Sequence, residues 1–326
     1  MRTFASTYLP RFPLDQRAQG KFFLFIPMSK VPNTDRALTY AEQIARLKKR
    51  GLVFENEAKA LHLLELISYY RLSNYWNPLI SDKETKNFYP GSTFETAFDI
   101  YKFDRELRLL VVRELEKIEV AVRAKMIYIL SHNRGPFWYT NSNNFSNPVD
   151  FSITLSKIAN EFNRSDDSFV KEFKKEYSDP LPPSWIMMET SSFGVLSNLY
   201  SNLVPGKDKR AIAHYFGVKD DVFVSWLHSI VYIRNICAHH SRLWNRYLRI
   251  KAIVPKSLDN LWLVNNSIEN KRVYFVLSMI IYLMNTINPK HSIQAKLKTL
   301  LENFPAIKTE AMGFPVNWEE EPLWKR

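Results

Sequence analysis

Residues 92–129 read STFETAFDIYKFDRELRLLVVRELEKIEVAVRAKMIYI, and this stretch decides the fold class. Its apolar residues recur at steps of three and four from Phe94 to Ile129, the spacing of one face of an α-helix. Ser92 and Glu95 form the S-x-x-E pattern that begins many helices, and Gly135-Pro136 is a helix stop. We therefore expect one helix of about forty residues, with charges of both signs on its solvated face.

Helical patterns continue through most of the chain. We predict helices over 39–51, 56–75, 151–164, 167–178, 184–203, 268–286 and 291–303, a short one ending near Gly217, and one running from Asp220 to Arg234. Only 8 glycines occur in 326 residues, and no run alternates as a strand would. The sequence thus predicts an all-α fold, a helical bundle with little or no sheet.

The N-terminal segment differs from the rest of the chain. Residues 1–32 contain four prolines and no sustained periodicity, which predicts an extended tail. Met28 is an alternative start that would make residues 1–27 dispensable. We expect residues 33–326 to form a single all-helical domain.

The net charge, the cysteine content and the apolar runs indicate the kind of partner and the cellular environment of the protein. The formal net charge of +12 suits an anionic partner, either nucleic acid or a membrane surface, although it could serve solubility alone. The single Cys237 excludes an internal disulfide and is compatible with a reducing cytosol. The longest near-apolar run, Val273 to Met284, is too short to span a bilayer and predicts a buried helix. We expect a soluble, cytoplasmic protein that does not bind membranes.

The segment 234–246, RNICAHHSRLWNR, carries the most unusual chemistry. It holds three arginines and the adjacent pair His239 and His240, and residues 222–258 include no Asp or Glu. Arginine presents a fork of donors that matches phosphate oxygens. The segment therefore indicates a phosphate-bearing partner, which we take to be RNA. Further phosphate contacts are expected from Arg242, Arg246, Arg249 and Lys251.

Arg234 and His239 are the expected catalytic pair. RNA can be cleaved without a metal when a base removes the 2′-hydroxyl proton and a cation stabilises the charge that grows on the phosphate; histidine and arginine suit these tasks. Five helical steps would leave the two side chains about 140° and about 7.5 Å apart. Either the helix ends or distorts near Cys237, or two copies of the motif face each other across a dimer. Asn235, four residues before His239, could orient its ring.

Structural alternatives exist for each of these residues. His239 could be a cation at a helix C-terminus, and His240 could be a structural support. Arg242 and Arg246 could pair with carboxylates elsewhere, and Arg234 could be buried against carboxylates.

A zinc site and exposed aromatic platforms are less favoured. Cys237 with His239 and His240 lacks a second cysteine, even if His214 or His228 were recruited, so we expect a buried cysteine and no metal or cofactor. We expect three tryptophans in the core rather than on a base-stacking surface: Trp185, Trp226 and Trp244.

The motif also resembles a known family. RNICAHH is similar to the arginine–polar–histidine pattern of HEPN-domain ribonucleases, and CAHHSRLWNR resembles bacterial Abi proteins of the AbiD/AbiF type, which act in abortive infection against phage. Other segments that carry the resemblance are SYYRLS (68–73), FDRELR (103–108) with Ile118-Glu119, SFGVLS (192–197) and GFP (313–315). The resemblance covers roughly residues 33–326.

The resemblance implies an all-helical HEPN fold, a homodimer that brings two Arg/His pairs together, and metal-independent RNA cleavage. By position, Arg234 and His239 match the catalytic residues, Asn235 matches the polar residue beside the arginine, and His240, Arg242 and Arg246 match the extended string. A small structured RNA is a further implied partner. Our leading hypothesis is a toxin-like endoribonuclease of antiviral defence. The alternatives are a non-catalytic, antitoxin-like RNA-binding protein and a purely protein-interacting helical module.

Overall fold

The computed structural model describes residues 36–265 and 267–325. The chain divides into two units, Met1–Thr39 and Tyr40–Arg326, and the helices belong to the second. The predicted tail at 1–32 and the alternative start at Met28 lie outside the described residues.

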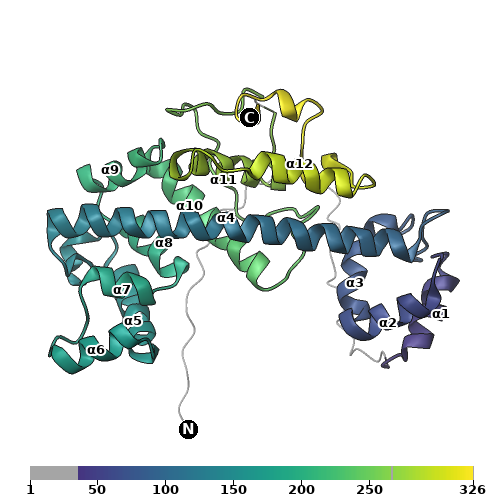
Figure 1. Cartoon of the computed structure of the whole chain (residues 1–326), viewed down its shortest axis with the longest axis horizontal. Helices are drawn as coiled ribbons and strands as arrows, with labels where there is room; N and C mark the ends of the chain where they lie inside the picture. The colour runs from purple at the N-terminus through teal and green to yellow at the C-terminus, as the bar shows by residue number, and fades with distance from the viewer. Residues whose placement is uncertain (1–35, 266, 326) are drawn as a thin grey trace, which may run out of the picture. The chain divides into compact units, whose positions relative to one another are not determined.

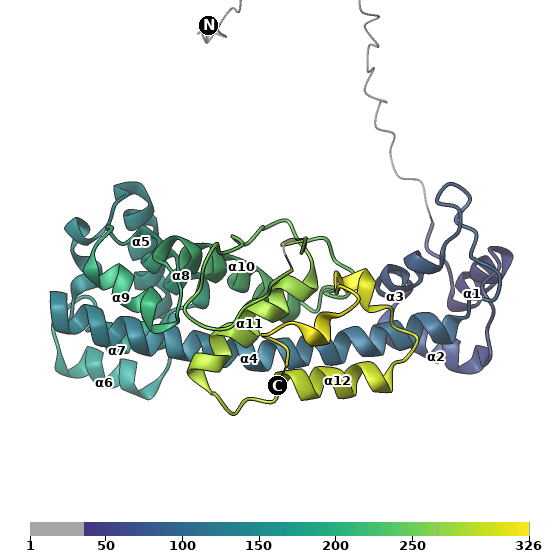
Figure 2. The same cartoon turned by 90° about the horizontal axis from the view of Figure 1, so that it is seen from above.

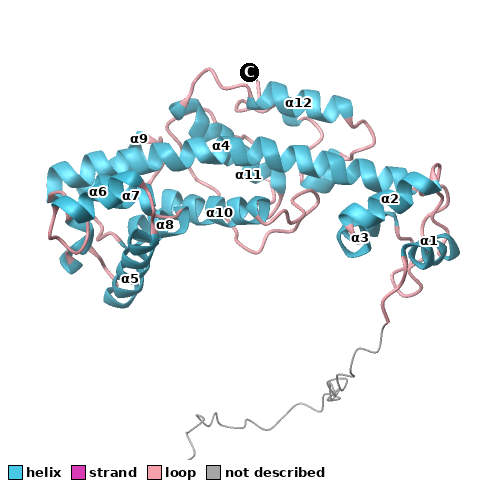
Figure 3. Ribbon diagram, turned by 60° about the horizontal axis from the view of Figure 1, so that its bottom comes forward, coloured by secondary structure: helices cyan, strands magenta, loops and turns pink. Residues whose placement is uncertain are grey.

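The second unit is built from helices and loops (Figure 3). Its α-helices are α1 (Tyr40–Lys49), α2 (Glu57–Ile67), α3 (Tyr69–Trp76), α4 (Phe94–Arg134), α5 (Pro148–Arg164), α6 (Ser168–Glu176), α7 (Ser184–Thr190), α8 (Phe193–Asn202), α9 (Lys207–Tyr215), α10 (Asp220–Ala238), α11 (Val273–Ile287) and α12 (Ile293–Asn303). Over the described ranges only isolated β-bridges occur, and no strand forms. The prediction of an all-α fold is confirmed.

Helix α4 is the 41-residue element that the periodicity of residues 92–129 predicts. Its N-cap is Thr93, whose hydroxyl accepts from the backbone N–H of Thr96 at 3.0 Å, so the predicted cap at Ser92 was wrong by one residue. The Glu95 carboxylate instead accepts the backbone N–H groups of Glu55 and Asn56, both at 3.2 Å. Glu95 therefore ties the start of α4 to the loop before α2.

Helix α4 is the central element of this unit. It contacts α3 near its N-terminal end, α7 and α9 in its C-terminal half, and α10, α11 and α12 along its length (Figure 1). Figure 2 shows α12 lying alongside it. The buried stripe of α4 recurs at helical spacing, as in Leu107, Val111, Leu115, Ile118 and Val122, and joins the main hydrophobic core. Burial of this stripe fixes which face of α4 meets the other helices.

Helix α11 and the C-terminal segment close the core. Every residue from Val273 to Met284 is buried, which confirms the predicted buried helix. The rings of Phe314 and Trp324 pack on Tyr274, with centroids 4.8 Å and 5.4 Å away. Among the helices of residues 36–265 and 267–325, none combines the length and apolarity needed to cross a bilayer.

Two predicted helices are each broken into two. The segment 56–75 forms α2 and α3, separated at Ser68, and 184–203 forms α7 and α8, separated at Ser191 and Ser192. Ser68 has φ 75° and caps α3 by accepting the backbone N–H of Arg71 at 3.4 Å. Serine competes with helical hydrogen bonding in this way, so an apolar stripe alone overestimates helix length.

The tryptophan prediction was right for two residues and wrong for one. Trp226 and Trp244 are buried. Trp185 is 48 % exposed because it lies on the outer side of the short helix α7, whose Met187 and Met188 are buried instead.

Candidate functional site

Helix α10 ends in a Schellman turn made by the two histidines. The backbone N–H of His240 donates to the carbonyl of Cys237 at 3.0 Å, and that of Ser241 donates to Ile236 at 2.9 Å. His239 is the C-cap residue, and His240 follows with φ 52°. Glycine is the usual residue at this left-handed position. The helix therefore ends near Cys237, as one of the two alternatives expected, and two motifs that face each other across a dimer stay a prediction.

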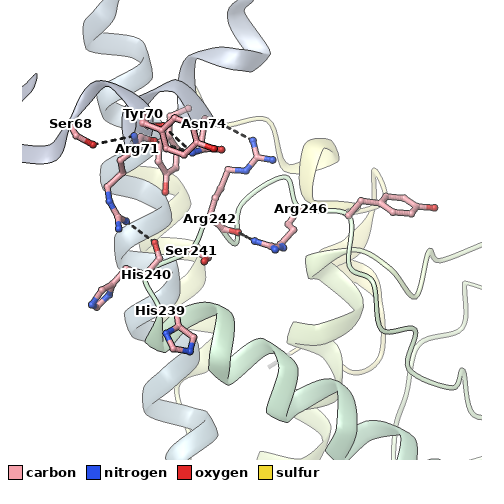
Figure 4. Close-up of a pocket in the computed structure, with 11 residues that line it drawn as sticks. Ser68, Tyr70, Arg71, Asn74, His239, His240, Ser241, Arg242 and Arg246 are labelled. Carbon is pink, nitrogen blue, oxygen red and sulfur yellow. Dashed lines mark hydrogen bonds between the residues drawn. The ribbon is translucent and has the colours of Figure 1, made fainter. Parts of the chain in front are cut away.

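An arginine from α3 holds this turn. The Arg71 guanidinium donates from Nη1 to the carbonyl oxygen of His240 at 2.8 Å (Figure 4). Arg71 lies in the first turn of α3, directly after the break at Ser68. Ser68 and His240 are two of the four non-glycine residues with positive φ in the described part of the chain, and they lie on the two sides of this contact. Such conformations cost about 1–3 kcal/mol each and cluster at functional sites.

The chain that follows the histidines is fixed by a buried carboxylate. Asp104 of α4 accepts the backbone N–H groups of Leu243 at 3.0 Å and Trp244 at 2.6 Å, and the hydroxyl of Tyr75 at 2.7 Å. Arg108, also buried, makes an ion pair with the same carboxylate. Burial raises the pKa of Asp104, and the Arg108 charge and these hydrogen bonds oppose that rise. Asp104 therefore anchors the segment after the turn to the central helix.

Two motif arginines use neutral partners. Arg242 donates to the backbone carbonyl of Asn74 at 2.8 Å, and Arg246 donates to the carbonyl of Arg242 at 3.0 Å. Burial lowers the pKa of Arg242, while the nearby Asp104 charge opposes that shift. In residues 36–265 and 267–325 neither arginine has a carboxylate within ion-pair distance. Each guanidinium therefore keeps positive charge and further N–H donors for a ligand.

These contacts border a cavity of about 670 Å³ that is open to solvent, between α3 and the end of α10 (Figure 4). Its lining consists of Ser68, Tyr70, Arg71, Asn74, Tyr75, His239, His240, Ser241, Arg242, Arg246 and Tyr247. The lining includes three arginines and two histidines but no carboxylate. A concave surface of this composition favours an anionic ligand that offers several acceptor oxygens.

Comparison with known proteins adds one finding. The sequence model of the Abi-like protein family matches residues 62–245, more than half of the chain. The chain belongs to the Abi-like protein family. No curated protein and no solved structure gave a match. Membership suggests a role in abortive infection, the defence of a bacterial population against phage, and the matched residues include most of the cavity.

Four of the predicted site residues of this Abi-like protein lie in the cavity, and four lie outside its lining. His239, His240, Arg242 and Arg246 line it, whereas Arg234, Asn235, Arg249 and Lys251 do not. Arg249 and Lys251 are exposed further along the loop.

Arg234 is exposed rather than buried near the end of α10 and lies outside the cavity lining. Its Nη1 lies 3.5 Å from the side-chain oxygen of Asn235. Burial raises the pKa of Glu119 on α4, and the charges of Arg123 and Arg234 oppose that rise. Within one chain, Arg234 therefore contributes to the field around Glu119 rather than to the cavity beside His239. The expected contact of the Asn235 side chain with the His239 ring is absent from the described hydrogen bonds.

Several cavity residues of the Abi-like protein were not singled out in the sequence. Arg71, Tyr70 and Asn74 come from α3, and Asp104 supports the cavity from α4. The segments SYYRLS and FDRELR, which carry part of the family resemblance, contain Tyr70, Arg71 and Asp104. The family resemblance therefore pointed to these segments. Their contact with residues 239–246 depends on the packing of α3 on α4, which the sequence alone does not show.

Cys237 is buried, as expected. Burial raises the pKa of its thiol to about 12. Within the described residues no three His, Cys, Asp or Glu side chains gather as a metal site would.

Proposed function

We propose that this Abi-like protein is a phage-defence endoribonuclease that cleaves RNA without a metal ion. The observation that carries the proposal is the cavity at the end of α10, where two histidines and three arginines meet without a carboxylate. We also propose that it is a HEPN ribonuclease of the AbiD/AbiF type, because the string RNICAHH lies at the end of a helix in an all-α fold.

The proposed reaction uses proton transfer and charge stabilisation. The His239 imidazole accepts the proton of a 2′-hydroxyl, and that oxygen attacks the adjacent phosphorus. The bond from phosphorus to the 5′-oxygen breaks, and the departing oxygen takes up a proton from His240 or water. The products are a 2′,3′-cyclic phosphate and a 5′-hydroxyl. Arginine donors stabilise the additional negative charge on the phosphate oxygens in the transition state.

In the proposed reaction, the Arg234 that acts with His239 belongs to a second copy of the chain. In one chain it lies outside the cavity that His239 lines, and its exposed guanidinium faces solvent near Glu119. A homodimer that joins the two α10 ends would bring Arg234 of one copy to His239 of the other. This arrangement accounts for a cation that lies outside the cavity lined by the base of its own chain.

The experiment is cleavage of a labelled RNA pool by the purified protein in EDTA, with single-stranded DNA as a control. We expect cuts in RNA alone that leave 2′,3′-cyclic phosphate ends, and their loss in His239→Ala. Cutting of DNA, or full activity in His239→Ala, would refute the proposed mechanism.

A second candidate is a non-catalytic RNA-binding protein that holds a small structured RNA. It is favoured by the three arginines that line the cavity, Arg71, Arg242 and Arg246. Arg71 and Arg242 donate to neutral carbonyl oxygens, so their positive charges can bind phosphate without any catalytic role for the histidines. Salt-dependent RNA binding without strand scission by the folded protein would favour this candidate, because binding rests on arginine contacts to phosphate.

A further inference from the structure

We propose that the cavity accepts RNA only as an unpaired strand, whose bases stack on Tyr70 and Tyr247 while the arginines hold the backbone. This inference rests on the proposed function in one respect, that the anionic ligand is RNA. It adds two binding residues and a substrate class, single-stranded RNA or the loop of a folded RNA.

Tyr70 presents its ring to the cavity rather than to the core. It is 84 % exposed and lines the cavity beside Arg71 (Figure 4). Its neighbour Tyr69 packs on Trp76 with a centroid distance of 5.0 Å, so the two adjacent tyrosines of α3 have opposite surroundings. Among the described aromatic contacts none involves Tyr70. Its ring faces are therefore free to take a base.

Tyr247 lies between this cavity and a neighbouring one of about 380 Å³, which Arg272 and Gly313 also line. It is 58 % exposed, and the Nζ of Lys271 lies 4.9 Å from the centre of its ring. The guanidinium of Arg272 lies 5.9 Å from the same centre. Cations at these distances attract the ring and limit its motion. A ring held in place loses less entropy when a base stacks on it.

The support under Tyr247 is itself fixed. Arg272 donates to the side-chain oxygen of Asn245 at 3.2 Å and to the carbonyl of Ala311. Gly313 has φ 86°, and a Cβ there would lie 2.5 Å from the Cβ of Arg272. Glycine is thus required for the close approach of Arg272. The glycine of the GFP segment at 313–315 thus allows Arg272 to reach the position from which it contacts the Tyr247 ring.

Geometry selects the form of RNA. Within a duplex each base already stacks on its neighbours, and an A-form helix displays edges and phosphates rather than base faces. An aromatic side chain that gains energy by stacking therefore needs an unpaired base. Two exposed tyrosines around three arginines match the combination of stacking surfaces and backbone-tracking charge that binds single strands.

The test is binding of fluorescent 2′-O-methyl RNA, which cannot be cleaved, by the full-length protein. Single-stranded and blunt duplex forms of one sequence are compared by anisotropy. The variants are Tyr70→Ala, Tyr247→Ala and the corresponding Phe substitutions. The control is Tyr128→Ala, a 63 % exposed tyrosine of α4 about 36 Å along the helix from Asp104.

We expect tighter binding of the single strand. Each Ala variant should weaken it about tenfold, the effect of one stacked base, while the Phe variants and Tyr128→Ala bind as the native protein does. With an abasic single strand, the native protein and the Ala variants should bind equally. Circular dichroism checks that each variant is folded.

Equal affinity for single strand and duplex, or an unchanged affinity in the Tyr70→Ala/Tyr247→Ala double variant, would overturn the inference. Binding of neither RNA form would overturn both the inference and the proposed function. Tyrosine-dependent binding of single strands by a protein that does not cut unmodified RNA would reject the ribonuclease alone.

Discussion

The guanidinium of Arg71 donates to the carbonyl oxygen of His240, 2.8 Å away and 169 residues later in the sequence. This bond joins the first turn of α3 to the turn that ends α10. It holds a histidine in a backbone conformation that glycine would adopt at lower cost. Position 240 therefore carries an imidazole despite the cost in backbone conformation. The bond from Arg71 connects the position of this residue to the N-terminal helices.

The first prediction concerns this bond. Arg71→Ala should lower the free energy of unfolding by about 1 kcal/mol, since one partly exposed hydrogen bond is lost. RNA cleavage should fall further than stability explains, because the cavity also loses one of three positive charges. The measurements are urea unfolding and kcat/KM.

The matched control is Arg105→Ala, an exposed arginine of α4 whose ion pair is with its neighbour Glu106. It should change neither quantity. Native cleavage by Arg71→Ala would contradict the assigned role of Arg71.

The second prediction separates the backbone of His240 from its ring. His240→Gly should raise the free energy of unfolding by up to about 1 kcal/mol, because glycine relieves the left-handed strain. His240→Ala keeps that strain and should not stabilise the fold. Both variants should reduce RNA affinity, because both lose the imidazole. Equal urea midpoints for the Gly and Ala variants would be inconsistent with strain at this position.

The third prediction concerns the anchor at Asp104. Asp104→Asn turns an acceptor of two backbone N–H groups into a partial donor and leaves Arg108 buried without its charge partner. Breaking a buried ion pair typically costs about 3–5 kcal/mol, so we expect a loss of that order in urea unfolding.

Asp99→Asn, on the exposed side of the same helix, is the control for this anchor. Its pair with Lys102 is exposed, and the substitution should cost less than about 1 kcal/mol. Similar losses in the two variants would show that Asp104 is not an anchor.

The fourth prediction concerns the buried thiol. Burial raises the pKa of Cys237 from an ordinary value of 9.0 to about 12, so the native thiol should resist a disulfide reagent at pH 8 and react upon unfolding. Because the folded state favours the protonated thiol, Cys237 contributes to stability at the pH values where its thiol is protonated. This contribution is complete below pH 9 and is lost as the pH rises toward 12.

Comparison with Cys237→Ala in urea unfolding at pH 8 and pH 10 isolates this effect. The native protein should lose more stability than the variant between the two values. Rapid labelling of the native protein at pH 8 would contradict the burial of Cys237.

The sequence predicts the helices well and their breaks poorly. The stripe of α4 and the apolar run of α11 determine buried faces by spacing alone, and both helices form where expected. The break at Ser68 interrupts an apolar pattern that continues on both sides of it. Only a local side-chain hydrogen bond and a positive φ end α2 there, and periodicity carries no information about either.

In the candidate site, too, contacts between residues close in sequence could be predicted, and contacts that depend on tertiary packing could not. His239, His240, Arg242 and Arg246 lie within eight residues of one another in the sequence, so their meeting in one cavity follows from the turn after α10. Arg71 reaches them through tertiary packing of α3, which a single sequence does not specify. Arg234 shows the converse, because closeness in sequence does not bring it into the cavity.

The most direct test of the account asks whether Arg234 and His239 act from different chains. Arg234→Ala and His239→Ala are each purified, mixed after partial unfolding, refolded together and assayed for RNA cleavage in EDTA. A mixed dimer carries one site with both residues intact, so we predict that the mixture cuts RNA while each variant refolded alone does not. A mixture as inactive as its components, with exchange of chains verified by two different tags, would contradict a site shared between two copies.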